Sequence, residues 1–377
     1  MIYTSHNAPI FGLIWALLLL FVTSCSETMD IVADQKLKFT GIEDCADALD
    51  FFSREDPFVI ETTEEALMAP SFIRIIENDG IFYALDQLKK KVVAFDKTGK
   101  IKFVINAVGS GPNEYISISD IAWDSKKNRI AILARDKILY ANEYGKIVDN
   151  TSLNSYYHYV AIADGNIFLT NSTYTNMRHA AYSISILDSD GNITETLPTL
   201  PEYAPFCMVN GPEISLINNE ILFTRKFDSN IYQIDDQGNY RAKYGLELNG
   251  SKFNPEEGMK YDCVELAKIC RETNRIYSMS DLQSGENYLA FNCNLSGLMI
   301  ASKHECNATL YKYLYDYNKT PLPNYIPVEN SNGLVFFYLD ANYFNIFAQN
   351  SKDPVLLDLS SRIASNSNPV ILPYRLR

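Results

Sequence analysis

The sequence predicts an all-β fold, a six-bladed β-propeller of four-stranded antiparallel blades with a short helical insertion. Three observations support this prediction. A strand hairpin that closes on an acidic or amide residue shortly before a glycine recurs four times. The copies are spaced by about 40 to 55 residues, the range of propeller blades. Between residues 72 and 248 helical periodicity is nearly absent, and 25 Tyr and 20 Phe against 2 Trp favour strands.

Composition indicates how large a core the chain can bury and which class of partner it disfavours. The chain has 377 residues, of which 47% are hydrophobic, enough to bury a large core. Its formal net charge of −13 repels phosphate backbones, so nucleic acid is not an expected partner. The basic run 89–91 falls in a predicted hairpin turn and is expected to be a solvated tip. We expect a monomer.

The N-terminus carries a targeting pattern. Residues 10–22 are apolar apart from Gly12, a run too short for a membrane span of about 20 residues but typical of a signal peptide. The following Val22-Thr23-Ser24-Cys25 resembles the lipobox of bacterial lipoproteins. Cleavage before Cys25 would leave a lipidated cysteine that tethers the protein to a membrane. We therefore expect a signal peptide over 1–24, a lipidated tether over 25–36 and the propeller over 37–377.

A second interpretation of this segment stays open. The first nine residues contain no Lys or Arg, whereas signal peptides usually begin with positive charge. The apolar run could instead be a buried strand or helix that ends in an incidental cysteine. If Cys25 is lipidated, the resemblance to lipoprotein sorting signals implies the outer membrane, because Ser26 and not Asp follows it. The expected location is the cell envelope, on the periplasmic or the external side.

The repeated units follow the tether in order. A β-prone run over 57–63 precedes the first and clearest unit. That unit has strands at 81–86, 92–96 and 100–105, with turns between them that include Gly99. Three later units repeat its order, with strand pairs at 129–134 and 137–142, at 166–170 and 182–188, and at 220–225 and 230–235.

The pattern changes after residue 248. Residues 255–271 carry an apolar stripe with helical spacing and begin with Pro255 and two Glu, so we predict a helical insertion there. Residues 368–376 are expected to pair with 57–63, because closure of the ring removes exposed strand edges. Between them we expect strands at 288–292, 298–302, 309–315 and 334–339, and a helix at 356–363.

Several motifs together resemble a known family. They are Phe58-Val-Ile-Glu61, Phe95-Asp96 with Gly99, Gly109-Ser-Gly-Pro-Asn-Glu-Tyr115 and Asn368-Pro-Val-Ile371. This set resembles the six-bladed β-propeller lipoproteins of Gram-negative bacteria, which are related in shape to NHL-repeat propellers. The resemblance covers the chain from about residue 37 to the C-terminus. It implies the fold and a cell-envelope location, and it implies no particular reaction.

The glycine-rich loop at 109–115 has two interpretations. No helix follows it, so it is not a phosphate-binding loop. In the structural interpretation the glycines adopt positive φ, Pro112 fixes a turn and Tyr115 packs where the chain crosses to the next blade. In the functional interpretation Glu114 points into the central funnel and contacts a ligand beside Tyr115.

A second ligand candidate is His158. It lies among Tyr156, Tyr157 and Tyr159, which either stack against sugar rings or belong to the core. No histidine has a partner at zinc spacing, so the sequence indicates no metal site. A Ca²⁺ ion in the central channel is an open alternative, with ligands that the sequence does not single out.

Six cysteines remain besides Cys25, an even number that permits disulfides in an exported protein. Cys293 and Cys306 flank a predicted hairpin and are the expected pair, with free buried thiols as the alternative. No catalytic Cys–His pattern and no Gly-x-Ser-x-Gly motif is present.

Two functions are therefore compatible with the sequence. The favoured one is a membrane-tethered, non-catalytic propeller lipoprotein that presents a face of loops to a glycan, a peptide or a protein. The alternative is a propeller hydrolase, lactonase or lyase that holds a metal ion in its central channel.

Overall fold

A computed structural model describes residues 31–69, 71–72, 74–134, 136–153, 155–170, 184–188, 192–195, 211–258 and 260–377. The predicted signal peptide, the lipidation site Cys25 and Cys207 lie outside these ranges. The fold described below is that of the compact unit Ala33–Arg377.

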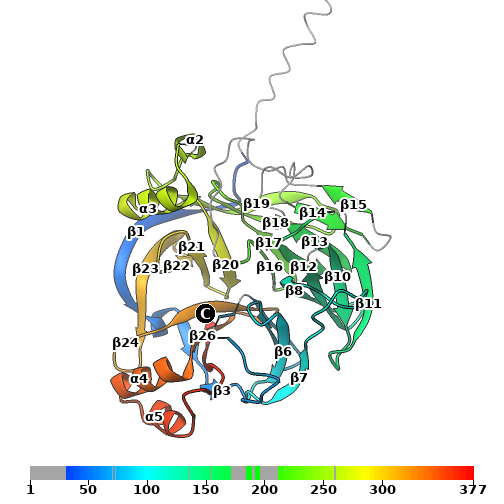
Figure 1. Ribbon diagram of the computed structural model, residues 1–377. Helices are drawn as coiled ribbons and strands as arrows, with labels where there is room; N and C mark the ends of the chain where they lie inside the picture. The colour runs from blue at the N-terminus through cyan, green and yellow to red at the C-terminus, as the bar shows by residue number, and fades with distance from the viewer. Residues whose placement is uncertain are drawn as a thin grey trace, which may run out of the picture. The chain divides into compact units, whose positions relative to one another are not determined.

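This unit is an all-β, propeller-like fold in which successive strands pair antiparallel in groups of four (Figure 1). The first two groups are β4 (Arg74–Asn78), β5 (Ile81–Asp86), β6 (Lys91–Asp96) and β7 (Ile101–Ile105), and β8 (Ile118–Asp124), β9 (Arg129–Ala134), β10 (Lys137–Ala141) and β11 (Ile147–Ser152). The next two are β12 (Tyr159–Ala163), β13 (Asn166–Thr170), β14 (Ile184–Leu187) and β15 (Ile193–Glu195), and β16 (Ile214–Ile217), β17 (Glu220–Phe223), β18 (Asn230–Ile234) and β19 (Tyr240–Glu247).

The C-terminal third continues this arrangement. One group is β20 (Met279–Ser284), β21 (Tyr288–Cys293), β22 (Leu298–Ser302) and β23 (Asn307–Asp316), extended by the short β24 (Thr320–Pro321). The last group is β25 (Asn324–Glu329), β26 (Leu334–Leu339) and β27 (Val370–Leu376), completed by β2 (Phe52–Arg54) and β3 (Phe58–Val59). The predicted pairing of the two chain ends is confirmed by the pairs Phe58↔Ile371 and Val59↔Val370.

The first strands of the groups lie beside one another in a ring. β4 contacts β8, β8 contacts β12, β12 contacts β16, β16 contacts β20 and β20 contacts β25. The ring closes where β25 runs parallel to β4. Because neighbouring groups cover both faces of these strands, their sequences are almost continuously apolar where they are buried, as in the Ile-Ala-Trp run of β8.

The recurring turns have a local physical cause. Asp79 and Gly80 both have positive φ, as do Asp164 and Gly165, which is the turn that matches the twist of a two-residue hairpin. The acidic or amide residue before each later glycine accepts hydrogen bonds from the backbone N–H groups of its own turn. Examples are Asp96 with Thr98, Asn142 with Tyr144, Asp188 with Asn192, and Asp235 with Gln237 and Asn239.

Strand β1 (Gln35–Asp47) lies outside the groups of four and was not predicted at this length. It pairs in parallel with β19 on one side, for example Leu37↔Leu246, and with β23 on the other, for example Ile42↔Leu310. It thereby covers the outer edges of two neighbouring groups, which would otherwise expose unpaired backbone.

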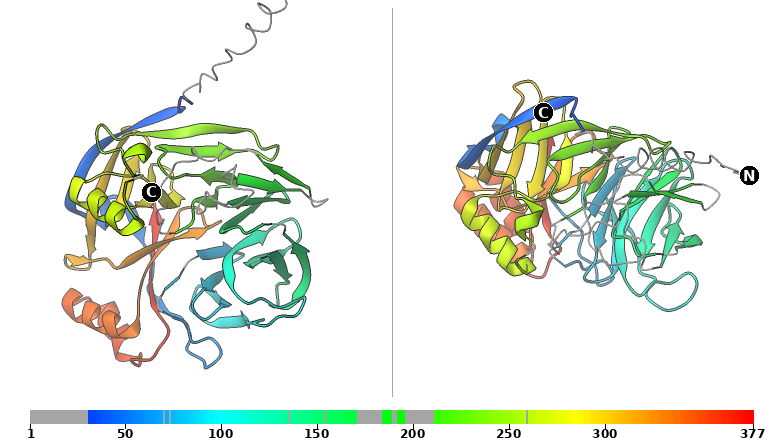
Figure 2. Two further views of the ribbon diagram at one scale, coloured as in Figure 1. Left: turned by 45° about the horizontal axis from the view of Figure 1, so that its top comes forward. Right: turned by 90° about the horizontal axis from the view of Figure 1, so that it is seen from above.

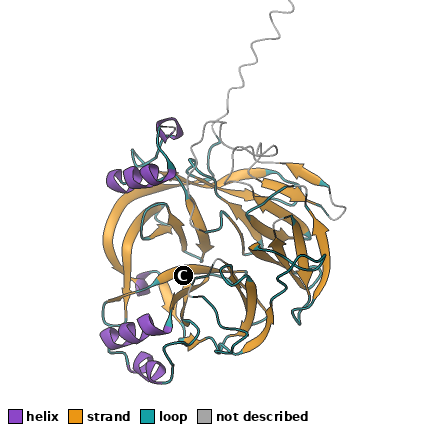
Figure 3. Ribbon diagram, viewed as in Figure 1, coloured by secondary structure: helices purple, strands orange, loops and turns teal. Residues whose placement is uncertain are grey.

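Within the described residues, the α-helices lie in two connections, and a short 3-10 helix, η2 (Ala48–Asp50), follows β1 (Figure 3). The predicted helix over 255–271 is divided into α2 (Pro255–Gly258) and α3 (Cys263–Thr273). Asp262 is the N-cap of α3, because its carboxylate accepts hydrogen bonds from the N–H groups of Val264 and Glu265. The predicted helix at 356–363 is α5 (Pro354–Ser361), and α4 (Ala341–Ser351) before it was not predicted.

The long described connections share one end of the strand groups. In an antiparallel group of four, the start of strand one, the turn between strands two and three, and the end of strand four lie together. Both helical connections fall at this end, toward one side of the strands (Figure 2). The opposite end carries tight turns such as 79–80 and 218–219. We call the first end the long-connection face, defined by residues 106–117, 248–258, 260–278, 317–323 and 340–369.

Candidate functional site

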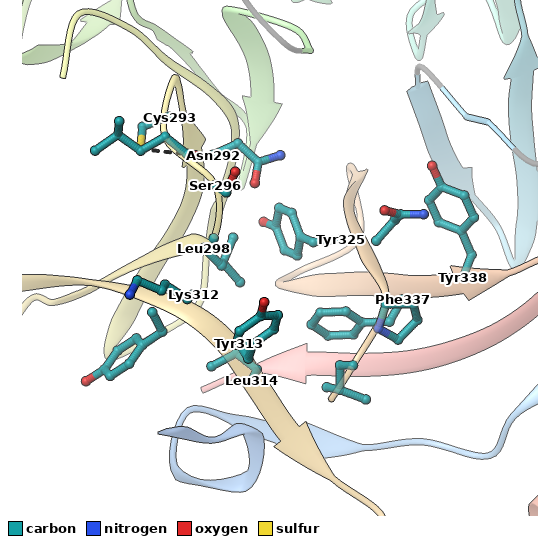
Figure 4. Close-up of a pocket in the computed structure, with 16 residues that line it drawn as sticks. Asn292, Cys293, Ser296, Leu298, Lys312, Tyr313, Leu314, Tyr325, Phe337 and Tyr338 are labelled. Carbon is teal, nitrogen blue, oxygen red and sulfur yellow. Dashed lines mark hydrogen bonds between the residues drawn. The ribbon is translucent and has the colours of Figure 1, made fainter. Parts of the chain in front are cut away.

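A recess of about 510 Å³ opens at the long-connection face between the last two strand groups (Figure 4). We call it the tyrosine pocket. Its volume lies within the range of about 300–1,000 Å³ that is typical of ligand sites. Its aromatic lining residues are Tyr311, Tyr313, Tyr325, Phe337 and Tyr338, and its polar ones include Asn292, Ser296, Lys312 and Asn324.

Unequal strand lengths create the open side of this pocket. Strand β22 begins at Leu298, which pairs with Tyr311, whereas β23 continues to Asp316. Tyr313 therefore lies beyond the end of its neighbouring strand, and 54% of its surface is exposed. Lys312 beside it forms an ion pair of 2.7 Å with Asp44 of β1.

Tyr325 forms the inner wall. Its hydroxyl lies 3.3 Å from the carbonyl oxygens of both Asp281 and Ala290. Its ring meets that of Phe337 edge-on at 6.0 Å, and Phe337 in turn meets Tyr374 at 5.3 Å. Burial raises the pKa of Tyr325 well above its usual value, so the hydroxyl stays protonated. Figure 4 shows this ring between the Asn292–Leu298 segment and the Phe337–Tyr338 segment.

The turn that forms the opposite wall depends on a glycine. Gly297 has φ +120°, a conformation that L side chains rarely adopt. A Cβ atom there would also overlap the carbonyl of Tyr311 on β23. Glycine therefore allows the Ser296–Leu298 segment to lie directly against β23.

The lining of the tyrosine pocket combines aromatic rings, amides and hydroxyls with the ammonium group of Lys312. No Asp, Glu, His or Arg is among the described residues that line it. The pocket instead offers aromatic rings, amides and hydroxyls, which suit a polar ligand with a flat apolar face.

A second polar region lies among the first strands. We call it the central charge cluster, formed by Arg74, Asp120, Asp281 and Glu329, all at most 7% exposed. Arg74 donates to Asp120 through Nε at 3.0 Å and Nη2 at 2.6 Å. Its Nη1 lies 3.1 Å from the Ile214 carbonyl and 3.3 Å from Glu329 Oε2. One guanidinium thereby joins β4, β8, β16 and β25.

The carboxylates of this cluster also bind backbone groups. Asp120 Oδ2 accepts the N–H of Val160 at 2.9 Å, and Glu329 Oε1 accepts the N–H of Leu216. Burial raises the pKa of Glu329 to about 7, against the opposing effect of Arg74. The cluster therefore links the ring of first strands through charge-assisted hydrogen bonds.

Asp281 connects the cluster to the tyrosine pocket. It has φ +53°, in an irregular stretch where the β20–β21 register shifts. Its carboxylate accepts Nδ2 of Asn292 at 2.9 Å, and its carbonyl accepts the hydroxyl of Tyr325. Burial raises the pKa of the Asp281 carboxyl to about 7. Its carboxylate also lies so close to Gly211 that a Cβ atom there would overlap it.

The central charge cluster does not fit a calcium ion. Calcium sites offer six to eight oxygen ligands that converge on one point. Here both oxygens of Asp120 and one of Glu329 converge on the Arg74 guanidinium, which has the position that a cation would need. Within the described residues, no group of three or more His, Cys, Asp or Glu side chains is arranged to hold a metal ion.

Comparison with protein families places the chain. The model of a family described as Domain of unknown function (DUF4934) matches residues 50–375. The chain belongs to this family. No curated protein matches its sequence significantly.

One solved structure has the same fold, and two others have lower similarity. A Bacteroides fragilis NCTC 9343 protein that is described as exported has a TM-score of 0.77 at 17% identity, over 91% of this chain and 99% of that one. A member of the DUF4221 family from Bacteroides vulgatus ATCC 8482 has a TM-score of 0.48 at 12% identity, over 86% and 98%. A streptogramin B lyase has a TM-score of 0.43 at 14% identity, over 78% of this chain and 82% of that one.

Within the described ranges, no helix combines the length and the apolar character needed to cross a membrane.

Glu114 and Tyr115 lie at a different recess, of about 240 Å³, together with Lys137. The Glu114 carboxylate folds over its own loop and accepts the N–H of Gly111 at 2.8 Å. Tyr115 is 1% exposed, and its hydroxyl donates to the Lys90 carbonyl at 2.9 Å and accepts the N–H of Ala107 at 3.1 Å. Tyr115 packs as the structural interpretation predicted, but the predicted positive φ is wrong for Gly109 and Gly111. Glycine is needed at 109 because a Cβ atom there would overlap the Glu114 carboxylate. A role of Glu114 and Tyr115 in ligand binding stays a prediction.

His158 lines neither recess, although Tyr156, two residues before it, lines the 240 Å³ recess beside Glu114. Its backbone N–H donates to the Thr170 carbonyl at 2.9 Å, which ends the pairing of β12 with β13. Burial and then the nearby Lys226 lower the pKa of its imidazole. The neighbouring Tyr157 is 6% exposed and packs in the core. Sugar stacking at this cluster also stays a prediction.

The expected disulfide is not formed. Cys293 is a buried free thiol and Cys306 an exposed one. Cys293 ends β21 at the long-connection face, whereas Cys306 lies in the turn between β22 and β23 at the opposite end. The two cysteines are therefore separated by the length of strand β22, which is beyond the reach of an S–S bond.

The residues of both regions were missed by sequence reasoning. The alternating Tyr311, Tyr313 and Tyr315 of β23 gave a usable signal, because alternate residues of a strand share a face. Arg74 and Asp120 gave none, since 46 positions separate them.

Proposed function

We propose that this chain is an exported six-bladed β-propeller lipoprotein, anchored through Cys25, that binds a ligand at its long-connection face without catalysing a reaction. One observation carries the functional part. The tyrosine pocket presents aromatic, amide and hydroxyl groups, and its described lining has no carboxylate, imidazole or guanidinium.

The strand pairing supports the blade count. Groups of four strands begin with β4, β8, β12, β16, β20 and β25, and β2 supplies the fourth strand of the last group. We interpret each group as one blade. Pairing between the two chain ends closes the ring in the way typical of circular propellers.

The anchor and the export route rest on the N-terminal sequence. An apolar run over 10–22 and the Val22-Thr23-Ser24-Cys25 sequence support a lipoprotein signal, and Ser26 favours the outer membrane. The Bacteroides fragilis protein of the same fold, which is described as exported, agrees with this route.

The alternative of a metal-dependent hydrolase or lyase has less support. Its acids would have to gather around an ion in the central channel. Of the acids in the central charge cluster, Asp120 and Glu329 bind Arg74 and backbone N–H groups, and Asp281 accepts the amide of Asn292.

Acyl labelling tests the anchor. Cells that express the full chain are grown with an alkyne-tagged fatty acid, and the protein is recovered from separated membranes. We expect label in the outer-membrane fraction for the wild type and for the Cys45→Ala control, whose cysteine lies on β1. We expect none for Cys25→Ala. Label that persists on Cys25→Ala, or its absence from the wild type, would refute the anchor.

A further inference from the structure

We infer that the tyrosine pocket is a glycan-binding site that takes one or two residues of a neutral saccharide, with the ring of Tyr313 as the stacking surface. This inference rests on the proposed binding function and names its ligand class.

The first argument is the accessibility of the ring and the paired strand that carries it. Tyr313 is 54% exposed, yet it lies on a strand that pairs with β1 through Cys45↔Tyr313. An aromatic ring held in this way presents apolar area at a small cost in conformational entropy. The C–H face of a pyranose is apolar and flat, so it complements such a ring, while its hydroxyls remain available for hydrogen bonds.

The second argument is the set of polar groups around that ring. Asn292 and Ser296 contribute an amide and a hydroxyl from the end of β21 and the turn after it, and Asn324 contributes an amide from β25. Figure 4 shows Asn292 and Ser296 on the side of Tyr325 away from Phe337. The bond from Asn292 Nδ2 to Asp281 fixes the orientation of that amide. Amides and hydroxyls both donate and accept hydrogen bonds, as the hydroxyls of a sugar require.

The third argument is charge. The described lining of the pocket has no carboxylate to attract a cationic ligand. Its cation Lys312 is paired with Asp44, and the net charge of −13 disfavours polyanions. A neutral saccharide therefore fits better than a sulfated or uronic one.

The fourth argument separates a glycan from an extended peptide. Peptides often bind by adding a strand to an open sheet edge. At the pocket, β22 pairs with β23 as far as Tyr311, and β24 pairs with it from Tyr315 onward. The N–H of Leu322 also donates to the Leu314 carbonyl at 2.7 Å. The open edge is thus limited to residues 312–313, too short to hold another strand.

A glycan array tests this inference with the mature full-length protein in detergent. The array carries neutral and acidic oligosaccharides from plant, animal and bacterial polysaccharides, and a peptide array is screened in parallel. We expect binding to neutral glycans. Tyr313→Ala should weaken the affinity for the best glycan about tenfold through loss of the ring, whereas Tyr313→Phe should retain most of it.

The control is Tyr343→Ala, which removes a tyrosine of α4 that is 66% exposed and does not line the pocket. It should leave the affinity unchanged. Circular dichroism checks that each variant is folded. Asn324→Ala, a second substitution in the pocket, should also weaken glycan binding.

The inference is overturned if no neutral glycan binds, if acidic glycans alone bind, or if binding is insensitive to Tyr313→Ala and Asn324→Ala. If peptides alone bind and Tyr313→Ala abolishes that binding, the glycan inference fails while the proposed binding function stands. If neither array shows binding that depends on the pocket, both fail.

Discussion

The tyrosine pocket and the central charge cluster lie next to each other and use their polar groups in opposite ways. In the cluster, the guanidinium of Arg74 donates hydrogen bonds to the carboxylate of Asp120, and both residues are at most 4% exposed. In the pocket, the Tyr313 ring and the amide of Asn324 line an open recess. Acids that converge at the centre of a ring of strands are therefore not sufficient to indicate a catalytic site. Polar groups available to a ligand distinguish a binding site from an internal crosslink.

The strongest test of this contrast is Arg74→Met. Removal of one partner from a buried ion pair leaves uncompensated charge and typically costs about 3–5 kcal/mol. We expect the free energy of unfolding in urea to fall by about that amount. Arg362→Met removes an arginine whose pair with Asp358 is exposed, and it should cost less than about 1 kcal/mol. Equal losses in the two variants would contradict a structural role for the cluster.

The next largest effect is expected at the wall of the pocket. Gly297→Ala combines strain at positive φ with an overlap on the Tyr311 carbonyl, and we expect a loss of about 1–3 kcal/mol. The matched control is Gly250→Ala, which has φ +92° but open space around its Cβ position. The difference between the two losses in free energy of unfolding measures the destabilisation that comes from the steric overlap. If the control costs as much, close approach of the turn to β23 is not what shapes the pocket.

A smaller effect concerns pH. Burial raises the carboxyl pKa of Glu329 and Asp281 to about 7 in the folded protein, against about 4 in an unfolded chain. Between these values the folded state holds more protons, so the free energy of unfolding contributed by these groups falls as pH rises from about 4 to about 7. Above about pH 7 this contribution levels off.

Urea unfolding at intervals between pH 4.5 and 8 measures that slope. Glu329→Gln should flatten it, because the glutamine does not titrate. The control Glu247→Gln changes an exposed carboxylate that pairs with Lys36, and it should leave the slope in place. A stability that rises steadily over this range and is indifferent to Glu329→Gln would contradict the assignment.

The smallest expected effect is that of metal removal. Because Arg74 has the position that a channel cation would need, we expect the melting temperature to be the same with a chelator as with added calcium. A clear rise with calcium that disappears in Asp120→Asn would show that the cluster can exchange its guanidinium for a metal. The metal-dependent alternative would then regain support.

Much of the fold could be predicted because its signals are local. The turns at Asp79-Gly80 and Asp96–Gly99 depend on the conformational preferences of a few neighbouring residues. Their repetition at blade spacing indicated the propeller-like arrangement, and the pairing of residues 58–59 with β27 was predicted from the need to close the ring. The length of β1 was missed, because its partners are β19 and β23, far along the chain.

The local sequence was enough to predict the repeated hairpins and the all-β class. The tertiary structure alone decided which polar residues meet. Arg74 reaches Asp120 across 46 positions, Glu329 reaches Leu216 across 113, and Tyr325 reaches Asp281 across 44. Such contacts leave no periodic trace, because each is made once, at the junction of strands that only the closed ring brings together. The tyrosine pocket also depends on the tertiary structure, because β23 extends beyond the end of β22 next to the last strand group.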